Sequence, residues 1–148
     1  MVLFLLSSCS IFRKKNKHAA IGQNAAGIAR GYIGTPYRAG GNDSRGIDCS
    51  GLICQSYVPL GLKLPRISWQ QAEFGRQIDI ADVIVGDLVF FVTSKKAEQN
   101  SINHAGIISM IDGKEVYFIH ASTSKGVRED KLLSEYWRKV LVKITRPF

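Results

Sequence analysis

The first half of the chain carries apolar residues at helical spacing. Over Ala19–Ile33 they recur every three or four positions until Gly34 ends the pattern, so we predict a helix there. A second helix is predicted over Cys49–Tyr57, which ends before a proline, and a short third one over Ser68–Phe74, with its serine as N-cap. Residues 34–46 are rich in glycine and are predicted to form a shaped loop.

The second half of the chain changes to a strand-like pattern. Four segments rich in Val, Ile and Phe are predicted to be strands: Asp87–Val92, His104–Ile111, Glu115–Ala121 and Lys139–Thr145. The polar segment 93–103 is predicted to be an exposed loop. Helices first and strands afterwards, without βαβ alternation, indicate an α+β domain whose helices pack on an antiparallel sheet of about five or six strands.

Composition supports one globular domain and narrows the function only a little. The chain has 148 residues, of which 45% are hydrophobic, and its formal net charge is +8. A basic surface favours anionic partners, but the excess lysines and arginines lie near the two ends, with no helix-turn-helix pattern and no aromatic residues placed between basic ones. We therefore expect no nucleic-acid binding.

The three cysteines do not form a disulfide framework. Cys49 and Cys54 lie five residues apart in the predicted second helix, where their side chains point about 140° apart and their Cα atoms lie roughly 8 Å apart, beyond disulfide reach. A zinc site made from these cysteines and the histidines lacks the paired spacing of zinc ligands. We interpret Cys54 as a small core residue, whereas Cys9 and Cys49 lie in sequence contexts that indicate separate roles.

The first residues resemble the lipobox of bacterial lipoproteins. A short apolar run leads into Leu6–Cys9, and in a lipobox the cysteine is lipidated and becomes the first residue of the mature protein. The run is too short to span a bilayer or to form a complete signal peptide, which implies a start codon farther upstream. The resemblance predicts a lipid anchor on Cys9 and divides the chain into a signal remnant with a basic tether, residues 1–23, and a domain, residues 24–148. Ser10 resembles a sorting signal, which predicts a place in the bacterial cell envelope, on the outer membrane facing the periplasm.

The sequence Asp48–Gly51 places a cysteine in the first turn of a helix. Unpaired amides and the helix dipole favour negative charge there, so we predict that the pKa of the Cys49 thiol is lowered and that its reactive thiolate forms readily. A nucleophile of this kind needs a base, and the base needs a group that orients it. His104 opens one predicted strand and His120 closes the next, whereas His18 lies in the tether.

The two histidines can meet only if they share one face of the sheet. Their strands are joined around Asp112 and Gly113, and a two-residue turn there puts His104 and His120 on opposite faces. An odd number of loop residues, or a bulge, brings them to the same face. We predict a three-residue loop over Ile111–Gly113, with the two histidines opposite each other and Gly113 at positive φ.

Five short motifs lie in order along the chain: Pro36–Gly41, Asp48–Gly51, Gly86–Phe91, His104–Ile107 and Ile119–Ser122. Together they resemble the NlpC-type cell-wall peptidases, a papain-like family, and the resemblance covers Asn24 to Arg146. It implies a papain-like fold, hydrolysis of peptidoglycan stem peptides beside their diamino acid, and no need for a metal or an organic cofactor. We expect a monomer.

The resemblance also assigns catalytic roles to individual residues. It implies that Cys49 is the nucleophile, His104 its general base and His120 the residue that orients the base. Ile102 and Asn103 depart from many members, in which different residues follow a shorter loop, and this departure bears on substrate preference.

Further residues are implied to bind substrate. Tyr37 matches a tyrosine whose hydroxyl lies near the nucleophile and stabilises the oxyanion, and Asp48 and Ser50 match positions that in some members contact the free amine of the stem peptide. Two alternatives stay open at this point. One is a wall-binding module that keeps the fold without catalysis, and the other is an amidase or acyltransferase with the same nucleophile arrangement.

Overall fold

The helices lie mainly in the first half of the chain in the computed structural model, which describes residues 6–94 and 101–148, with side chains from residue 10 onwards. The long α1 (Leu6–Gly31) is followed by α2 (Cys49–Tyr57) and by the single-turn α3 (Ser68–Gln71). Two short 3-10 helices, η1 (Val58–Leu60) and η2 (Ile80–Asp82), lie in the connections. The bounds predicted for α2 are confirmed.

A six-stranded antiparallel sheet makes up most of the second half. Its order is β3-β8-β4-β5-β6-β7, and every neighbouring pair runs antiparallel. Its strands are β3 (Arg76–Gln77), β4 (Leu88–Phe91), β5 (His104–Asp112), β6 (Glu115–Ser122), β7 (Gly126–Lys131) and β8 (Leu141–Arg146), with α4 (Glu135–Val140) before the last. A separate two-stranded hairpin, β1 (Asn42–Asp43) and β2 (Gly46–Ile47), precedes α2. The predicted α+β class and antiparallel sheet are confirmed.

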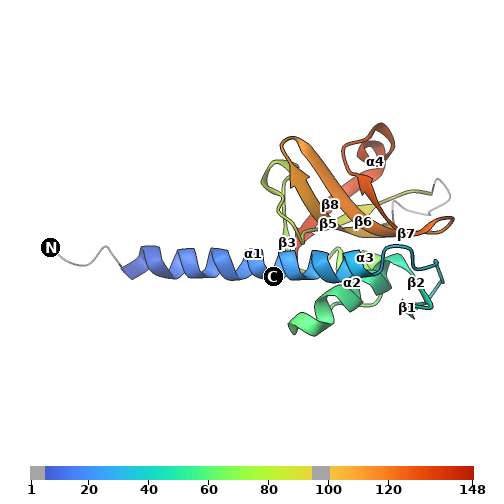
Figure 1. Ribbon diagram of the computed structural model, residues 1–148. Helices are drawn as coiled ribbons and strands as arrows, with labels where there is room; N and C mark the ends of the chain where they lie inside the picture. Colours follow the sequence, from blue (N-terminus) through green and yellow to red (C-terminus); the bar gives the residue numbers. More distant parts are fainter. Residues whose placement is uncertain (1–5, 95–100) are drawn as a thin grey trace.

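Two hydrophobic clusters cover the two faces of the sheet. The first lies between the sheet and helices α1 and α2, and joins Leu52 and Ile53 of α2 to Ala105 of β5. The second lies on the other face, where Trp137 of α4 packs against Phe118. Figure 1 shows α1 and α2 below the sheet and α4 above it. Because α2 packs against β5, the beginnings of these two elements lie where the helical layer meets the sheet.

Some predicted elements differ from the structure. α1 already includes residues assigned to the tether, because the segment is rich in lysine, arginine and alanine and holds no proline to end a helix. Ser68 does not cap α3, since Ile67 occupies the N-cap and the Ser68 hydroxyl donates to the backbone oxygen of Ile102 (3.4 Å). Strand β7 and helix α4 were not predicted at all, because mixed charged and apolar residues hide their patterns.

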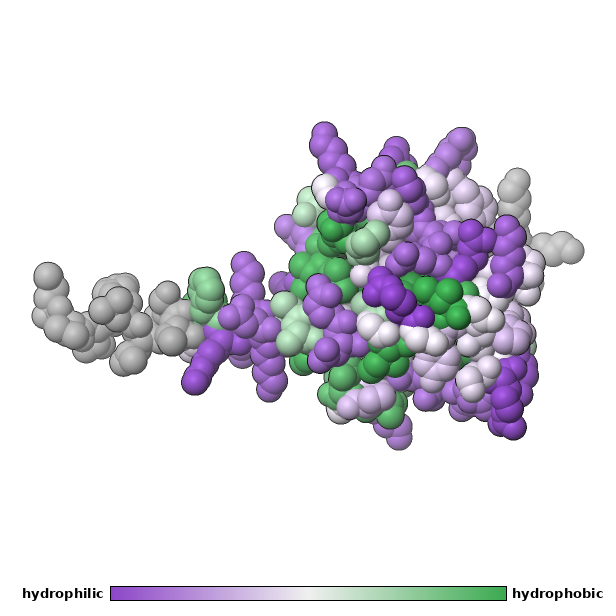
Figure 2. All heavy atoms as spheres, viewed as in Figure 1, coloured by the Kyte–Doolittle hydropathy of each residue, from purple (hydrophilic) through white to green (hydrophobic). Residues whose placement is uncertain are grey.

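The described start of α1 projects from the body of the protein. Figure 2 shows that this projecting part is largely hydrophilic, and two apolar side chains on it, Ile11 and Phe12, are exposed. Across residues 6–94 and 101–148, no helix is both long enough and apolar enough to cross a membrane. The backbone of Cys9 belongs to α1, but its side chain and the apolar residues 1–5 lie outside the described part, as does most of the segment expected to be a loop, 95–100.

Candidate active site

Cys49 is the first residue of α2 and is half-buried. Helix α2 begins there because Asp48 acts as its N-cap. Asp48 has extended backbone angles, and its carboxylate accepts a hydrogen bond from the backbone amide of Gly51 (2.8 Å). The backbone amides of Ala105 and Ser50 both face the Cys49 sulfur. The cysteine therefore lies beside the residue that follows His104, at the junction of helix and sheet.

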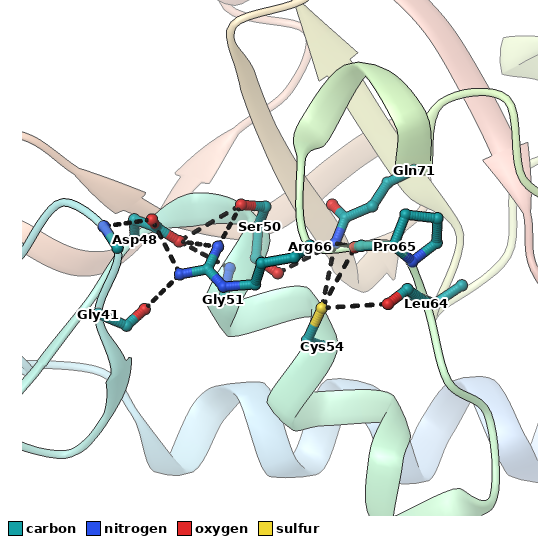
Figure 3. Close-up of polar contacts among 10 residues, drawn as sticks. Gly41, Asp48, Ser50, Gly51, Cys54, Leu64, Pro65, Arg66 and Gln71 are labelled. Atoms are coloured by element: carbon teal, nitrogen blue, oxygen red, sulfur yellow. Dashed lines mark hydrogen bonds and ion pairs between the residues drawn. The ribbon is translucent and has the colours of Figure 1, made fainter.

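The Asp48 carboxylate is occupied by partners within the protein. Arg66 donates to both of its oxygens (2.8 and 3.0 Å), and the amide of Gly40 donates to the second (2.8 Å). Arg66 also donates to the Ser50 hydroxyl (2.7 Å) and to the backbone oxygen of Gly41 (3.0 Å), as Figure 3 shows. A substrate amine that approached Asp48 or Ser50 would have to compete with this guanidinium. Sequence reasoning missed Arg66, which lies far from the motif in sequence.

His104 and His120 share one face of the sheet, as predicted, but through a bulge. The turn has two residues, because Asp112 pairs with Glu115, and the register then shifts between Ile108 and Met110. The predicted three-residue loop is therefore wrong, whereas the positive φ of Gly113 (57°) is confirmed.

The register beyond the bulge decides how the two histidines meet. Ile107 pairs with Ile119, so one step further along the strands His120 lies opposite Gly106 and diagonal to His104. The expectation that the histidines lie directly opposite each other is wrong. A side chain at Gly106 would come within 3.3 Å of the His120 Cβ and within 2.7 Å of the Phe118 ring, so the glycine leaves room for the imidazole.

The bulge residue, Ser109, is tied to two other elements. Its hydroxyl donates to Glu129 on β7 (2.6 Å), and Arg30 of α1 donates to the same carboxylate oxygen (3.2 Å) and to the backbone oxygen of Ser109 (3.4 Å). Ser109 is nearly fully buried, so its hydroxyl needs such a partner. These contacts hold the extra residue in place and so help to fix the register of the histidine pair.

A chain of hydrogen bonds runs from His104 to an acid that sequence reasoning missed. His104 and His120 are joined Nε2 to Nδ1 (2.9 Å), and the second nitrogen of His120 contacts Asp130 (2.8 Å). Arg128 donates to the other oxygen of Asp130 (2.9 Å). Asp130 lies on β7, the strand that was not predicted. The sequence feature that could have revealed Asp130 is its spacing of two residues from Arg128. In a strand, residues two apart lie on one face, and here that face lies beside His120.

This chain fixes which nitrogen of His104 can act as a base. The Asp130 carboxylate can only accept, so Nε2–H of His120 donates to it. Burial lowers the pKa of both histidines, that of His104 to about 3, so both rings are neutral at pH 7. Neutral His120 then accepts through Nδ1 from Nε2–H of His104. Nδ1 of His104 is left with a free lone pair.

Aromatic rings surround both imidazoles and restrict their rotation. His104 stacks on Trp137 with a ring angle of 19° and a centroid distance of 5.6 Å, and His120 stacks on Phe118 in the same way at 4.8 Å. Trp137 both packs in the second cluster and lines the pocket beside Cys49. The rings are thus oriented by packing as well as by hydrogen bonds.

The expected lowering of the Cys49 pKa is not found. Burial, and then the neighbouring Asp48 carboxylate, raises the pKa of the Cys49 thiol, and the amides of Ala105, Ser50 and Cys49 itself oppose that rise without outweighing it. Burial first, and then His120, lowers the pKa of His104 to about 3. The substrate-free site therefore holds a neutral thiol beside a neutral imidazole, not a preformed ion pair.

Two adjoining pockets meet at the thiol. The histidine-side pocket, about 460 Å³, is lined by Cys49 together with the histidine pair, and the Arg66-side pocket, about 500 Å³, lies on the other side of the thiol. Cys49, Tyr37 and Asn103 line both, so the thiol lies in the middle of an extended groove.

Tyr37 is held beside Ile47 by two backbone hydrogen bonds, from Arg38 to Ile47 (3.2 Å) and from Ile47 to Pro36 (3.1 Å). Burial, and then Cys49, raises the pKa of its phenol, which stays protonated and able to donate. The structure thus brings five predicted residues to one groove: Tyr37, Asp48, Cys49, Ser50 and His104. His120 lines the histidine-side pocket as well.

Comparison with known proteins agrees with this arrangement. The model of the NlpC/P60 family matches residues 34–146, most of the chain. The chain belongs to the NlpC/P60 family. It is 40% identical to the probable endopeptidase NlpC of Escherichia coli K12 over 142 residues, covering 91% of this chain and 88% of that protein. It is 36% identical over 107 residues to murein DD-endopeptidase MepS/murein LD-carboxypeptidase of the same organism, covering 72% of this chain and 52% of that one.

The fold is also shared by a family protein described as non-catalytic. RipD of Mycobacterium tuberculosis, described as adapted to peptidoglycan binding, superposes with a TM-score of 0.63 and 23% identity over 86% of this chain and 98% of that one. At this identity the likeness concerns the fold alone. Membership of the family therefore has to be read together with the residues of the site before a reaction is inferred.

Proposed function

We propose that this NlpC/P60 protein is a cell-wall hydrolase, a cysteine peptidase that cuts peptidoglycan stem peptides beside their diamino acid. The observation that carries the proposal is the hydrogen-bonded chain from His104 through His120 to Asp130, which begins in the pocket that Cys49 lines. Relatives named endopeptidase and murein endopeptidase support the substrate. A binding module of the same fold has no need of an oriented base beside a thiol.

The first step follows from the protonation states of the site. The Cys49 sulfur attacks the peptide carbonyl carbon while its proton passes to the free Nδ1 of His104. The Tyr37 phenol, which stays protonated, can donate to the oxyanion that develops. The positive charge that appears on His104 stays on its ring and is stabilised by the hydrogen bond to His120, whose accepting tautomer is held by the Asp130 carboxylate.

The acyl-enzyme then forms and is hydrolysed. The tetrahedral intermediate collapses with cleavage of the carbon–nitrogen bond, and His104 returns the proton to the departing amine. A water molecule next attacks the thioester carbon and gives a proton to His104, and the thiol leaves with that proton. Each proton transfer and each bond change in this sequence is assigned to Cys49, His104 or water, so no metal or organic cofactor is required by the proposal.

Digestion of purified muropeptides tests this function. The parent protein and the Cys49→Ala variant are each incubated with muropeptides of known structure, and the products are weighed by mass spectrometry. We expect the parent to release fragments cut beside the diamino acid and the variant to release none. Products cut at an amide outside the stem peptide would favour an amidase, and binding without any cleavage by the parent would favour a wall-binding module.

We also propose that Cys9 carries lipid and anchors the protein to the outer membrane, facing the periplasm. The lipobox-like Leu6–Cys9 and the basic residues that follow support this location, because basic side chains are attracted to anionic lipid headgroups. In the native host, the full-length gene product is expected in the membrane fraction, and Cys9→Ser is expected to release it. Recovery of the parent in the soluble fraction would reject the anchor.

A further inference from the structure

The histidine-side pocket extends away from the thiol to a wall that the reaction does not use. The last residue of β6 and the turn that follows it form this wall with hydroxyl and amine side chains, Ser122, Thr123, Ser124 and Lys125. Tyr136 of α4 and Arg128 of β7 complete it. Because the wall belongs to the same pocket as Cys49, a substrate bound at the thiol can reach it.

The charges of this wall are unbalanced. Asp130 is the acidic residue that lines the pocket, and both of its oxygens are engaged, one by His120 and the other by Arg128. Lys125 is exposed, and its ammonium has no acidic partner in the part of the chain that the structure describes. Arg128 uses Nε and one terminal nitrogen on Asp130, and its side chain is still 38% exposed. The wall therefore offers positive charge and hydroxyl donors to an anionic group.

We propose that Lys125, supported by the exposed side of Arg128, binds the free side-chain carboxylate of the diamino acid next to the bond that is cut. The inference rests on the proposed function, which places that amino acid beside Cys49. A carboxylate is favoured over a neutral amide because it is attracted to both cations and can accept hydrogen bonds from the ammonium and the neighbouring hydroxyls. Lys125 thus acts in the choice of substrate and not in the chemical step.

Two stem peptides that differ in one group test the site. In one peptide the side-chain carboxylate of the diamino acid is free, and in the other it is an amide. We expect the parent protein to show a KM for the acid about three- to tenfold lower than for the amide, with similar kcat. Lys125→Gln should remove this preference by raising KM for the acid, Lys125→Glu should reverse it, and added salt should weaken it in the parent.

Lys114→Gln is the matched control. Lys114 is also an exposed lysine, in the turn at the other end of the β5–β6 hairpin from His104, so its loss should leave the preference unchanged. Arg128 is left intact because it also holds Asp130.

Binding of both peptides to the Cys49→Ala protein, measured by calorimetry, separates this inference from the proposed function. Cleavage of acid and amide with equal KM, and their binding with equal Kd, overturns the carboxylate site and leaves the peptidase intact. If neither peptide is cleaved, the proposed function fails, and the ratio of the two Kd values still decides the carboxylate site. Lack of binding of either peptide overturns both.

Discussion

Two cysteines of one short helix have opposite surroundings. Cys49 begins α2, lines both pockets and lies beside Ala105, whereas Cys54 is buried one and a half turns later. The Cys54 sulfur faces the backbone oxygens of Leu64 (3.6 Å) and Pro65 (3.3 Å), and the amide nitrogen of Gln71 donates to it (3.4 Å).

The pKa does not separate the two thiols, because burial raises it in both. Access to substrate and a base with a free lone pair separate them instead. Only the first cysteine combines an open groove with a neutral imidazole, among the residues that the structure describes. The proposed nucleophile therefore differs from Cys54 in its neighbours and not in the direction of its pKa shift.

The largest effect is expected from Cys49→Ala. Loss of the nucleophile should lower kcat/KM for muropeptide cleavage by at least about a thousandfold, because no other group can form the acyl-enzyme. The melting temperature should stay within about 2 °C of the parent, since the residue is half-buried and only one atom is lost. Activity of the variant equal to that of the parent would reject Cys49 as the nucleophile.

Asp130→Asn should have the next largest effect. An amide can donate a hydrogen bond to His120 and so reverse the direction of the chain, which turns Nδ1 of His104 into a donor. We expect kcat to fall by about a hundredfold or more while KM changes little. Asp112→Asn, at the exposed end of β5, is the control and should keep full activity. A fall in KM alone, or an unchanged kcat, would show that the chain does not orient the base.

The pH dependence of alkylation tests the neutral state of the site. In a Cys9→Ser background, iodoacetamide should label Cys49 about tenfold faster for each pH unit from 6 up to and beyond about 8.5, because its pKa is raised and only the thiolate reacts. Cys54 should resist labelling at every pH at which the fold persists. A rate that is constant between pH 5 and 8 would instead reveal a thiolate–imidazolium pair.

The smallest effect is expected from Cys54→Ala. Removal of the buried sulfur should lower the free energy of unfolding by about 1 kcal/mol, through a small cavity and the lost contacts with Gln71 and Pro65. Chemical denaturation measures this change. Muropeptide cleavage should stay within about threefold of the parent. A loss of activity as large as that of Cys49→Ala would contradict the division of roles between the two cysteines.

The central fold could be predicted because its patterns are simple. Helix α2 shows an N-cap and ends before a proline, β4 is a continuous run of apolar residues, and β5 and β6 are rich in them. Strand β7 was not predicted because four of its six residues are charged and its burial depends on its neighbours in the sheet. Helix α1 was predicted too short, since its projecting part has no apolar stripe to signal a helix.

Residues of the candidate site could be predicted where they lie within a short sequence motif. The residues Cys49, His104 and His120 lie at element ends that the sequence marks. Asp130 and Arg66 act through contacts between distant segments, and such contacts have no local pattern. The same reason explains the error in the Cys49 pKa, because the helix N-terminus is visible in the sequence whereas burial under β5 is not. The bulge at Ser109 likewise depends on Arg30 and Glu129.

The bulge divides the β5–β6 hairpin into two halves whose registers differ by one residue. Toward the groove the strands follow the register of Ile107 with Ile119, and toward the turn they follow that of Met110 with Tyr117. Deleting Ser109 would remove the extra residue and the irregularity together, and both registers would persist in one continuous ladder. A deletion between His104 and Ile108 would turn one imidazole to the other face. A change in length that is equal on both strands of the turn half would therefore leave the two imidazoles on one face.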